Sequence, residues 1–139
     1  MYLLITGSTE TARALIADTF LEGHGDWKHL ALEDIEEEDG ADDEDILGMQ
    51  MMFMTMVACQ CAKDAREEGH SILITCPSPE MIDSVLAEIP ERIVTVHLGD
   101  LSEADAFDYV IDTRRKSVEK TCRELDGIVS GPGRAGARS

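Results

Sequence analysis

The residues best placed to do chemistry follow the first apolar run of the chain. Residues 2–6 (YLLIT) are typical of a buried strand, and the polar turn that follows leads into a helical pattern. In a parallel α/β sheet, ligands bind beyond the carboxyl ends of the strands. A phosphate is held at such a turn by backbone N–H groups and by a cation. The candidate nucleotide-binding residues are therefore Gly7, Ser8, Thr9 and Arg13.

This turn lacks most of a phosphate-binding loop. When the pattern G-x-x-x-x-G-K-[ST] is counted from Gly7, Ala12, Arg13 and Ala14 stand where the second glycine, the lysine and the magnesium-binding hydroxyl belong. The positive end of the following helix dipole remains. Arg13 is the cation nearest to the turn in sequence, and two interpretations stay open: it contacts phosphate, or it is a solvent-facing helix residue.

A second candidate site is a strongly acidic segment. Residues 33–45 (EDIEEEDGADDED) carry ten of the 29 acidic residues and no base, so the formal charge of −17 falls to −7 without them. The candidate residues for binding a basic partner are Glu36, Glu37, Glu38, Asp39, Asp42, Asp43, Glu44 and Asp45. The alternative is a solvated loop that its like charges keep extended.

The same acidity excludes several classes of function. A nucleic-acid binder needs Lys and Arg to displace counterions, and an anionic membrane surface attracts basic segments, so we expect neither partner. The acidic segment does not fit a calcium loop, because Asp39 occupies the position that requires glycine. We expect no metal site. The expected partner is a protein with a basic surface.

Methionines crowd the segment that follows. Five of the eight residues 49–56 are methionine, and they fall on every side of a helix, so a core cannot bury them all. We expect two or three of them in the core and the rest in an adaptable apolar contact surface. Met51 and Met54 are the candidate contact residues, and a homo-oligomer through this helix is a further possibility.

The remaining pattern predicts an α/β fold. Strands and helices alternate, which favours a three-layer sandwich with a five-stranded, mainly parallel sheet. The predicted strands are residues 2–6, 29–32, 71–76, 92–98 and 109–112. Helices are predicted after a cap at Ser8 or Thr9, at 47–68, from Ser78 and Pro79, and after a cap at Ser117. Residues 1–130 are expected to form one domain, followed by a flexible basic tail at 131–139.

Helical spacing also predicts which side chains these helices bury. The predicted inward positions are Ala12, Leu15, Ile16 and Phe20; Ile82, Val85, Leu86 and Ile89; and Val118, Cys122, Leu125 and Val129. Met49, Met52, Phe53, Met56 and either Cys59 or Gln60 share one side of the long helix. No apolar run reaches the ~20 residues that cross a bilayer. A soluble, cytoplasmic protein is expected.

The four cysteines lie in apolar stretches. Cys59, Cys61, Cys76 and Cys122 are therefore expected to be buried and reduced. Two residues apart on a helix, Cys59 and Cys61 point about 200° from each other and cannot easily share a metal.

The chain as a whole resembles the P-loop kinases, and within them the phage-type deoxynucleoside monophosphate kinases. LLITG followed by STETARAL is similar to their opening with part of the phosphate loop deleted. LALEDIEEE resembles their motif after the second strand, which places the acidic catalytic residue at Asp34. EEGHSILITCPSPE and FDYVIDTRRKSVEKTCREL are similar to their third strand and their final strand and helix.

The departures from this family concern phosphoryl transfer. The loop lysine is missing, and Cys76, Pro77 and Ser78 stand where the family has an acid and an arginine after the third strand. About eight residues separate Leu98 from Phe107, where these kinases carry a lid with arginines. Phosphoryl transfer depends on positive charge around an anionic transition state. These absences favour a chain that has lost the reaction.

Three hypotheses follow from the sequence. The preferred one is a kinase-derived domain without phosphoryl transfer and without a cofactor, which acts by protein binding through the acidic segment and the methionine-rich helix. The first alternative is an active deoxynucleoside monophosphate kinase that uses ATP and magnesium. The second is an acidic mimic of nucleic acid that inhibits a basic host protein, as a phage-encoded chain in the host cytoplasm would. An opening similar to short-chain dehydrogenases is a weaker resemblance, because no Tyr-x-x-x-Lys pair is present.

Overall fold

Strands and helices alternate through the part of the chain that can be described. The computed structural model describes residues 1–7, 9–32, 44–77, 79–99, 107–113 and 116–130. Its elements are β1 (Tyr2–Gly7), α1 (Glu10–Glu22), β2 (Trp27–Ala31), α2 (Glu44–Glu67), β3 (Ser71–Cys76), α3 (Pro79–Glu88), β4 (Ile93–Leu98), β5 (Tyr109–Ile111) and α4 (Val118–Ser130). The predicted succession of elements is confirmed, with shifts of a few residues at their ends.

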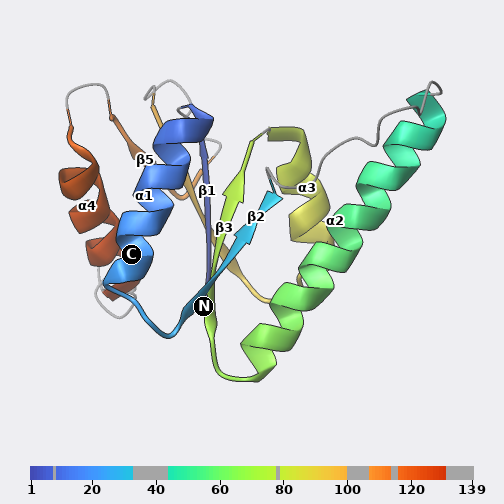
Figure 1. The fold of residues 1–139 in the computed structure, drawn as a ribbon, viewed down its shortest axis with the longest axis horizontal. Coiled ribbons are helices and arrows are strands. Elements are labelled where there is room, and N and C mark those ends of the chain that lie inside the picture. The colour runs from blue at the N-terminus through green and yellow to red at the C-terminus, as the bar shows by residue number, and fades with distance from the viewer. Residues whose placement is uncertain (8, 33–43, 78, 100–106, 114–115, 131–139) are drawn as a thin grey trace.

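The five strands form one sheet in the order β2-β3-β1-β4-β5. Each of the four neighbouring pairs is parallel. Helices α1 and α4 cover one face of the sheet, and α2 and α3 cover the other (Figure 1). The predicted three-layer α/β sandwich is confirmed, and the sheet is parallel throughout.

Strand β1 is buried on both faces because it lies at the centre of the sheet. Leu3 and Ile5 pack with Ile16 and Phe20 of α1. Tyr2 and Leu4 belong to the second core, which α2 and α3 cover. A strand with a helix layer on each side reads as a continuous apolar run, and this explains the pattern YLLIT.

Two helix positions that were predicted to be buried are exposed. Leu15 is 52% exposed and Leu86 is 44% exposed. In α1 the buried side is formed instead by Arg13, Ile16, Ala17 and Phe20. Each misplaced leucine is adjacent in sequence to a buried residue, and one residue turns a helix by about 100°.

Both caps that the structure describes are as predicted. Thr9 Oγ1 accepts a hydrogen bond from the N–H of Ala12 at 3.1 Å, and Ser117 Oγ accepts one from the N–H of Lys120 at 3.1 Å. Each supplies an acceptor to a helix end that would otherwise leave its N–H groups unpaired. In the described part of the chain, no helix is long and apolar enough to span a bilayer.

Gly7 ends β1 in a conformation and a space that suit glycine. Its φ is +87°, and a Cβ atom there would lie 2.4 Å from the carbonyl oxygen of Leu98 and 2.8 Å from Cε1 of His97. A side chain would therefore combine backbone strain with a clash against the backbone of β4.

We predict that Gly7→Ala lowers the free energy of unfolding by about 2 kcal/mol or more, because both penalties act together. Urea denaturation of the two proteins measures the difference. The control is Gly127→Ala in α4, where a Cβ would meet no atom within 4 Å. That control should gain about 0.5–1 kcal/mol from helix propensity. Equal stability of Gly7→Ala and the parent chain would show that β4 does not crowd Gly7.

Candidate functional site

The candidate phosphate site lies where three parallel strands end side by side. Thr6 of β1 is in register with Cys76 of β3 and His97 of β4, and Gly7 is in register with Leu98. Helix α1 begins at Glu10, directly after its cap at Thr9. The turn from strand to helix is therefore too short for the four residues and the second glycine of a phosphate loop. Ser8 lies outside the described residues.

Arg13 turns back toward the end of β1. Its side chain is 5% exposed, and Nη1 donates a hydrogen bond to the carbonyl oxygen of Gly7 at 2.9 Å. The interpretation of Arg13 as a solvent-facing residue is wrong. The geometric reason is that α1 places Arg13 one turn after its cap, on the same side as Ile16 and Ala17. The guanidinium thus fixes the chain's own turn.

His97 lies against Gly7 on the side where a Cβ atom would be. A Cβ atom added to Gly7 would also lie 2.9 Å from Nδ1 of His97. The imidazole therefore lies directly against the glycine. The ring of Phe107 stacks on this imidazole at 5.0 Å between centroids, with 20° between the planes. Nδ1 is buried and has no hydrogen-bond partner in the described part of the chain. Gly7 therefore allows close packing of β4 against β1.

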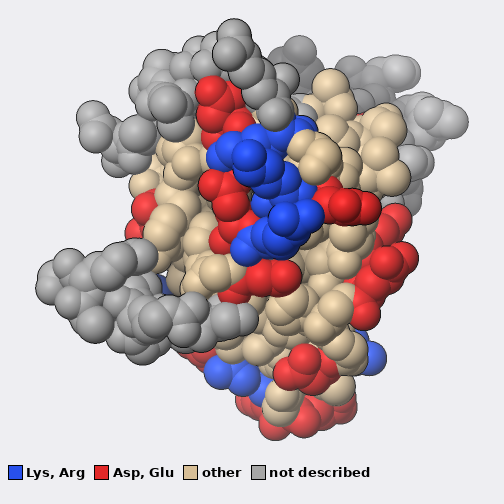
Figure 2. All heavy atoms as spheres, turned by 90° about the vertical axis from the view of Figure 1, so that its left-hand side faces the viewer, with Lys and Arg blue, Asp and Glu red and all other residues tan. Residues whose placement is uncertain are grey.

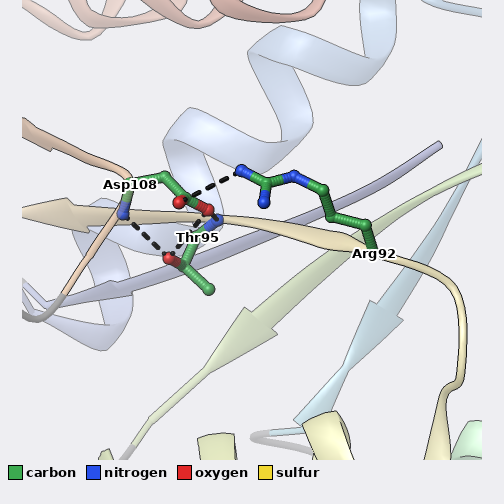
Figure 3. Close-up of polar contacts among 3 residues, drawn as sticks. All are labelled: Arg92, Thr95 and Asp108. Atoms are coloured by element: carbon green, nitrogen blue, oxygen red, sulfur yellow. Dashed lines mark hydrogen bonds and ion pairs between the residues drawn. The ribbon is translucent and has the colours of Figure 1, made fainter.

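The chain returns to the sheet before β5 through a clasp on β4. Asp108 accepts hydrogen bonds from the N–H of Thr95 at 3.0 Å and from its hydroxyl at 3.3 Å, and its own N–H donates to Thr95 Oγ1 at 3.0 Å (Figure 3). The other carboxylate oxygen accepts from Arg92 at 3.2 Å. The clasp fixes Asp108, directly before β5, to β4 and to Arg92.

Three of the four cysteines are buried, and Cys61 is exposed. The prediction that all four are buried is therefore wrong for Cys61, which lies two residues after Cys59 and so on another side of α2. Burial raises the pKa of Cys59 to about 11 and that of Cys122 to about 11. Both thiols stay protonated and unreactive at neutral pH, which fits packing residues rather than catalytic ones.

The acidic candidates fall largely outside the described residues. Asp34, Glu36, Glu37, Glu38, Asp39, Asp42 and Asp43 all lie in residues 33–43, which are not described. Glu44 and Asp45 form the start of α2, and Met51 lies within it, but the side chains of these three are not described. Their roles as partner-binding residues, and that of Asp34 in catalysis, stay predictions.

One apolar side of α2 points away from the core. The buried side consists of Thr55, Cys59 and Ala62. Met49, Met52, Phe53, Met56 and Val57 are 71%, 64%, 64%, 45% and 46% exposed. We call these five residues the apolar stripe. Met54 is also 44% exposed. The expectation that two or three methionines fill the core is wrong for the four whose side chains are described.

Basic side chains gather on the face that carries α4. Figure 2 shows Lys and Arg side by side with acidic groups on this face. Lys120 and Arg123 are three residues apart and share one side of α4, and Lys116 lies just before this helix. Lys116 pairs with Glu124 at 2.6 Å. The neighbouring acids offset this basic row, which the sequence interpretation did not single out.

No family model and no curated protein matches the sequence of this chain. Solved structures do match it. A sugar kinase from Janibacter sp. HTCC2649 has a TM-score of 0.64 at 13% identity, over 93% of this chain and 94% of that chain. A guanylate kinase from Anaplasma phagocytophilum has a TM-score of 0.56 at 14% identity, over 94% and 85%. This chain has the P-loop kinase fold.

The P-loop kinase fold does not by itself bring an activity. A de novo designed P-loop fold protein also matches, with a TM-score of 0.51 at 12% identity, over 95% of this chain and 96% of that chain. At such identities the likeness concerns the backbone, and function depends on the side chains at the site. For this chain, those side chains are Arg13, His97 and Phe107 around Gly7.

We predict that Arg13→Ala lowers the free energy of unfolding by about 1–3 kcal/mol, because the carbonyl of Gly7 loses a charged, buried donor. Thermal or urea denaturation measures the loss. Arg123→Ala is the matched control, since Arg123 is exposed on α4, and it should change stability by less than about 0.5 kcal/mol. An Arg13→Ala protein as stable as this control would mean that the guanidinium does not hold the turn.

Proposed function

We propose that this chain is a P-loop kinase-fold protein that has lost phosphoryl transfer and acts by binding a protein with a basic surface. The single observation that carries the loss is the contact of Arg13 with the Gly7 carbonyl. The cation nearest to the turn is buried and serves the fold, so it is poorly placed to meet the phosphates of a nucleotide. ATP and magnesium are accordingly not cofactors of this protein.

Two further contacts support the loss of the reaction. His97 lies against Gly7, where close approach of an anion to the backbone would need open space. Thr9 Oγ1 accepts a hydrogen bond from the N–H of Ala12, so this N–H of the first helical turn is already paired within the fold. An oxyanion needs free donors arranged around it. At this turn the Arg13 guanidinium, the Ala12 N–H and the space beside the glycine are engaged by the protein itself.

Protein binding is supported by the neighbourhood of α2. The acidic segment 33–45 leads directly into this helix. Met54 is exposed in the middle part of α2, and Met51 is proposed to join it. A partner with Lys and Arg around an apolar patch would meet charge first and then apolar contact. The chain would work in the cytoplasm, and in a host cytoplasm if it is phage-encoded.

The first experiment titrates the protein with magnesium-ATP by calorimetry, alone and with a deoxynucleoside monophosphate, and then assays phosphate transfer. We expect neither saturable heat below about 1 mM nor product. An active guanylate kinase serves as the positive control. Micromolar, magnesium-dependent binding with transfer to the monophosphate would instead establish the kinase alternative, and Arg13→Ala should then abolish turnover.

The second experiment neutralises Asp42, Asp43, Glu44 and Asp45 together, as Asn and Gln. The probe is an immobilised lysine-rich peptide of about 20 residues, and surface plasmon resonance measures the association rate constant. We expect a fall of about tenfold or more at low salt, because the clustered charges steer the encounter.

The matched control neutralises four exposed acids elsewhere, Asp18, Glu22, Glu67 and Asp83. It changes the net charge equally and should slow association much less. Equal slowing by the two variants would show that overall charge, rather than the acidic segment, attracts the basic probe.

A further inference from the structure

Helix α2 has two apolar sides, and the fold uses one of them. Thr55, Cys59 and Ala62 pack against the sheet. At about 100° per residue, Phe53 lies opposite the middle of that buried side. The apolar stripe is centred on Phe53 and faces outward. In Figure 1 the amino-terminal half of α2 rises along the edge of the molecule, away from the sheet.

The apolar stripe is large for a free surface. At about 200 Å² for a whole large side chain, its five members expose on the order of 600 Å², which equals the largest apolar patch of a typical monomer. A standard interface takes about 800 Å² from each partner. Exposed neighbours on the same side, such as Gln60 and Asp64, supply the polar remainder. The exposed area is therefore close to what a stable dimer buries.

We propose that the apolar stripe binds the apolar stripe of a second copy, in an antiparallel pair of α2 helices related by a two-fold axis beside Phe53. This inference goes beyond the proposed function, because it concerns the outward side of α2 and not the phosphate site or the acidic segment. In this register Met49 of one copy faces Val57 of the other. Such a surface is complementary to itself, as a two-fold interface requires.

The side chains of the stripe suit this pairing. None of the five carries a charge or a hydrogen-bonding group, so two copies can close on each other without leaving a buried polar atom unpaired. Three are methionines, which are flexible enough to fill the gaps between crossing helices. Phe53 provides the large central anchor that dominates the binding energy of many interfaces.

The charge of the chain selects the antiparallel direction. A parallel pair would bring two acidic segments, with ten acids each, to the same end of the helices. In an antiparallel pair centred on Phe53, Glu44 of one copy faces Ala62 of the other, so the two starts of α2 lie 18 residues, or about 27 Å, apart along the helix axis. That distance is several Debye lengths at physiological salt, so the repulsion is largely screened. Opposed helix dipoles favour the same arrangement.

The test is sedimentation equilibrium of the full chain between about 1 and 100 µM. We expect a dimer whose dissociation constant rises at least 30-fold in Phe53→Glu, which places a charge at the centre of the interface. Leu15→Glu is the matched control, because Leu15 is 52% exposed on α1, on the opposite face of the sheet. It should leave the dissociation constant unchanged. Circular dichroism confirms that each variant is folded.

Several outcomes would overturn the proposal. These are a monomer at every concentration, a Phe53→Glu dimer as tight as the parent dimer, and a loss of the dimer in Leu15→Glu. If the chain is a monomer and Phe53→Glu destabilises it, another segment of this chain covers the stripe. If the stability of the monomer is unchanged, the stripe is a surface for a different protein. Neither result bears on phosphoryl transfer or on the basic probe, so the proposed function fails or stands separately.

Salt and cross-linking test the arrangement. Raising NaCl from about 0.05 to 0.5 M should tighten the dimer or leave it unchanged, since it screens repulsion between two chains of charge −17. Marked weakening of the dimer would contradict an apolar interface.

In a Cys61→Ser background, a short bismaleimide should link Met49→Cys to Val57→Cys in a mixture faster than it links either protein to itself. Faster self-linking of Met49→Cys would show a parallel pair and overturn the proposed one.

Discussion

Contacts of Arg13 and of β4 hold Gly7 at the end of β1, and the layout of the carboxyl edge of the sheet depends on these contacts. Arg13 binds its carbonyl oxygen, while His97 and the backbone of β4 press against its Cα. Together these contacts fix a tight turn, start α1 at once and bring β4 close to the central strand. The space beside Gly7 thus joins a helix and two strands.

One side of helix α2 packs in the core, and the opposite side forms part of the molecular surface. Its inward side is narrow and contains small residues, Thr55, Cys59 and Ala62, so the helix can lie close to the sheet. The larger side chains of the apolar stripe are left on the outside, where they add nothing to the core of this chain. Burial of that side in an assembly would therefore add stability without altering the core, which fits an interface that can form and dissociate.

The sequence was sufficient to predict the strands, because a central parallel strand such as β1 must be apolar on both faces. It also located the cap at Ser117 and narrowed the first cap to Ser8 or Thr9, since capping is a local interaction. It failed where the outcome depends on distant contacts. The burial of Arg13 depends on the Gly7 carbonyl at the end of β1, which lies outside the helix that carries Arg13. Periodicity could not show which side of α2 faces the core, because this helix has two apolar sides. The acidic candidates lie mainly outside the described residues.

The Asp108–Thr95 clasp also bears on how such a fold can change its length. Because Asp108 is tied to β4 by three hydrogen bonds, and Gly99 N–H donates to the Ile111 carbonyl at 2.9 Å, both ends of the connection between β4 and β5 are anchored to the sheet. A doubling of a flexible connection between fixed ends costs only about 0.6 kcal/mol of closure entropy. The fold can thus accept or lose a long insertion at this point, while the register of β4 and β5 stays the same.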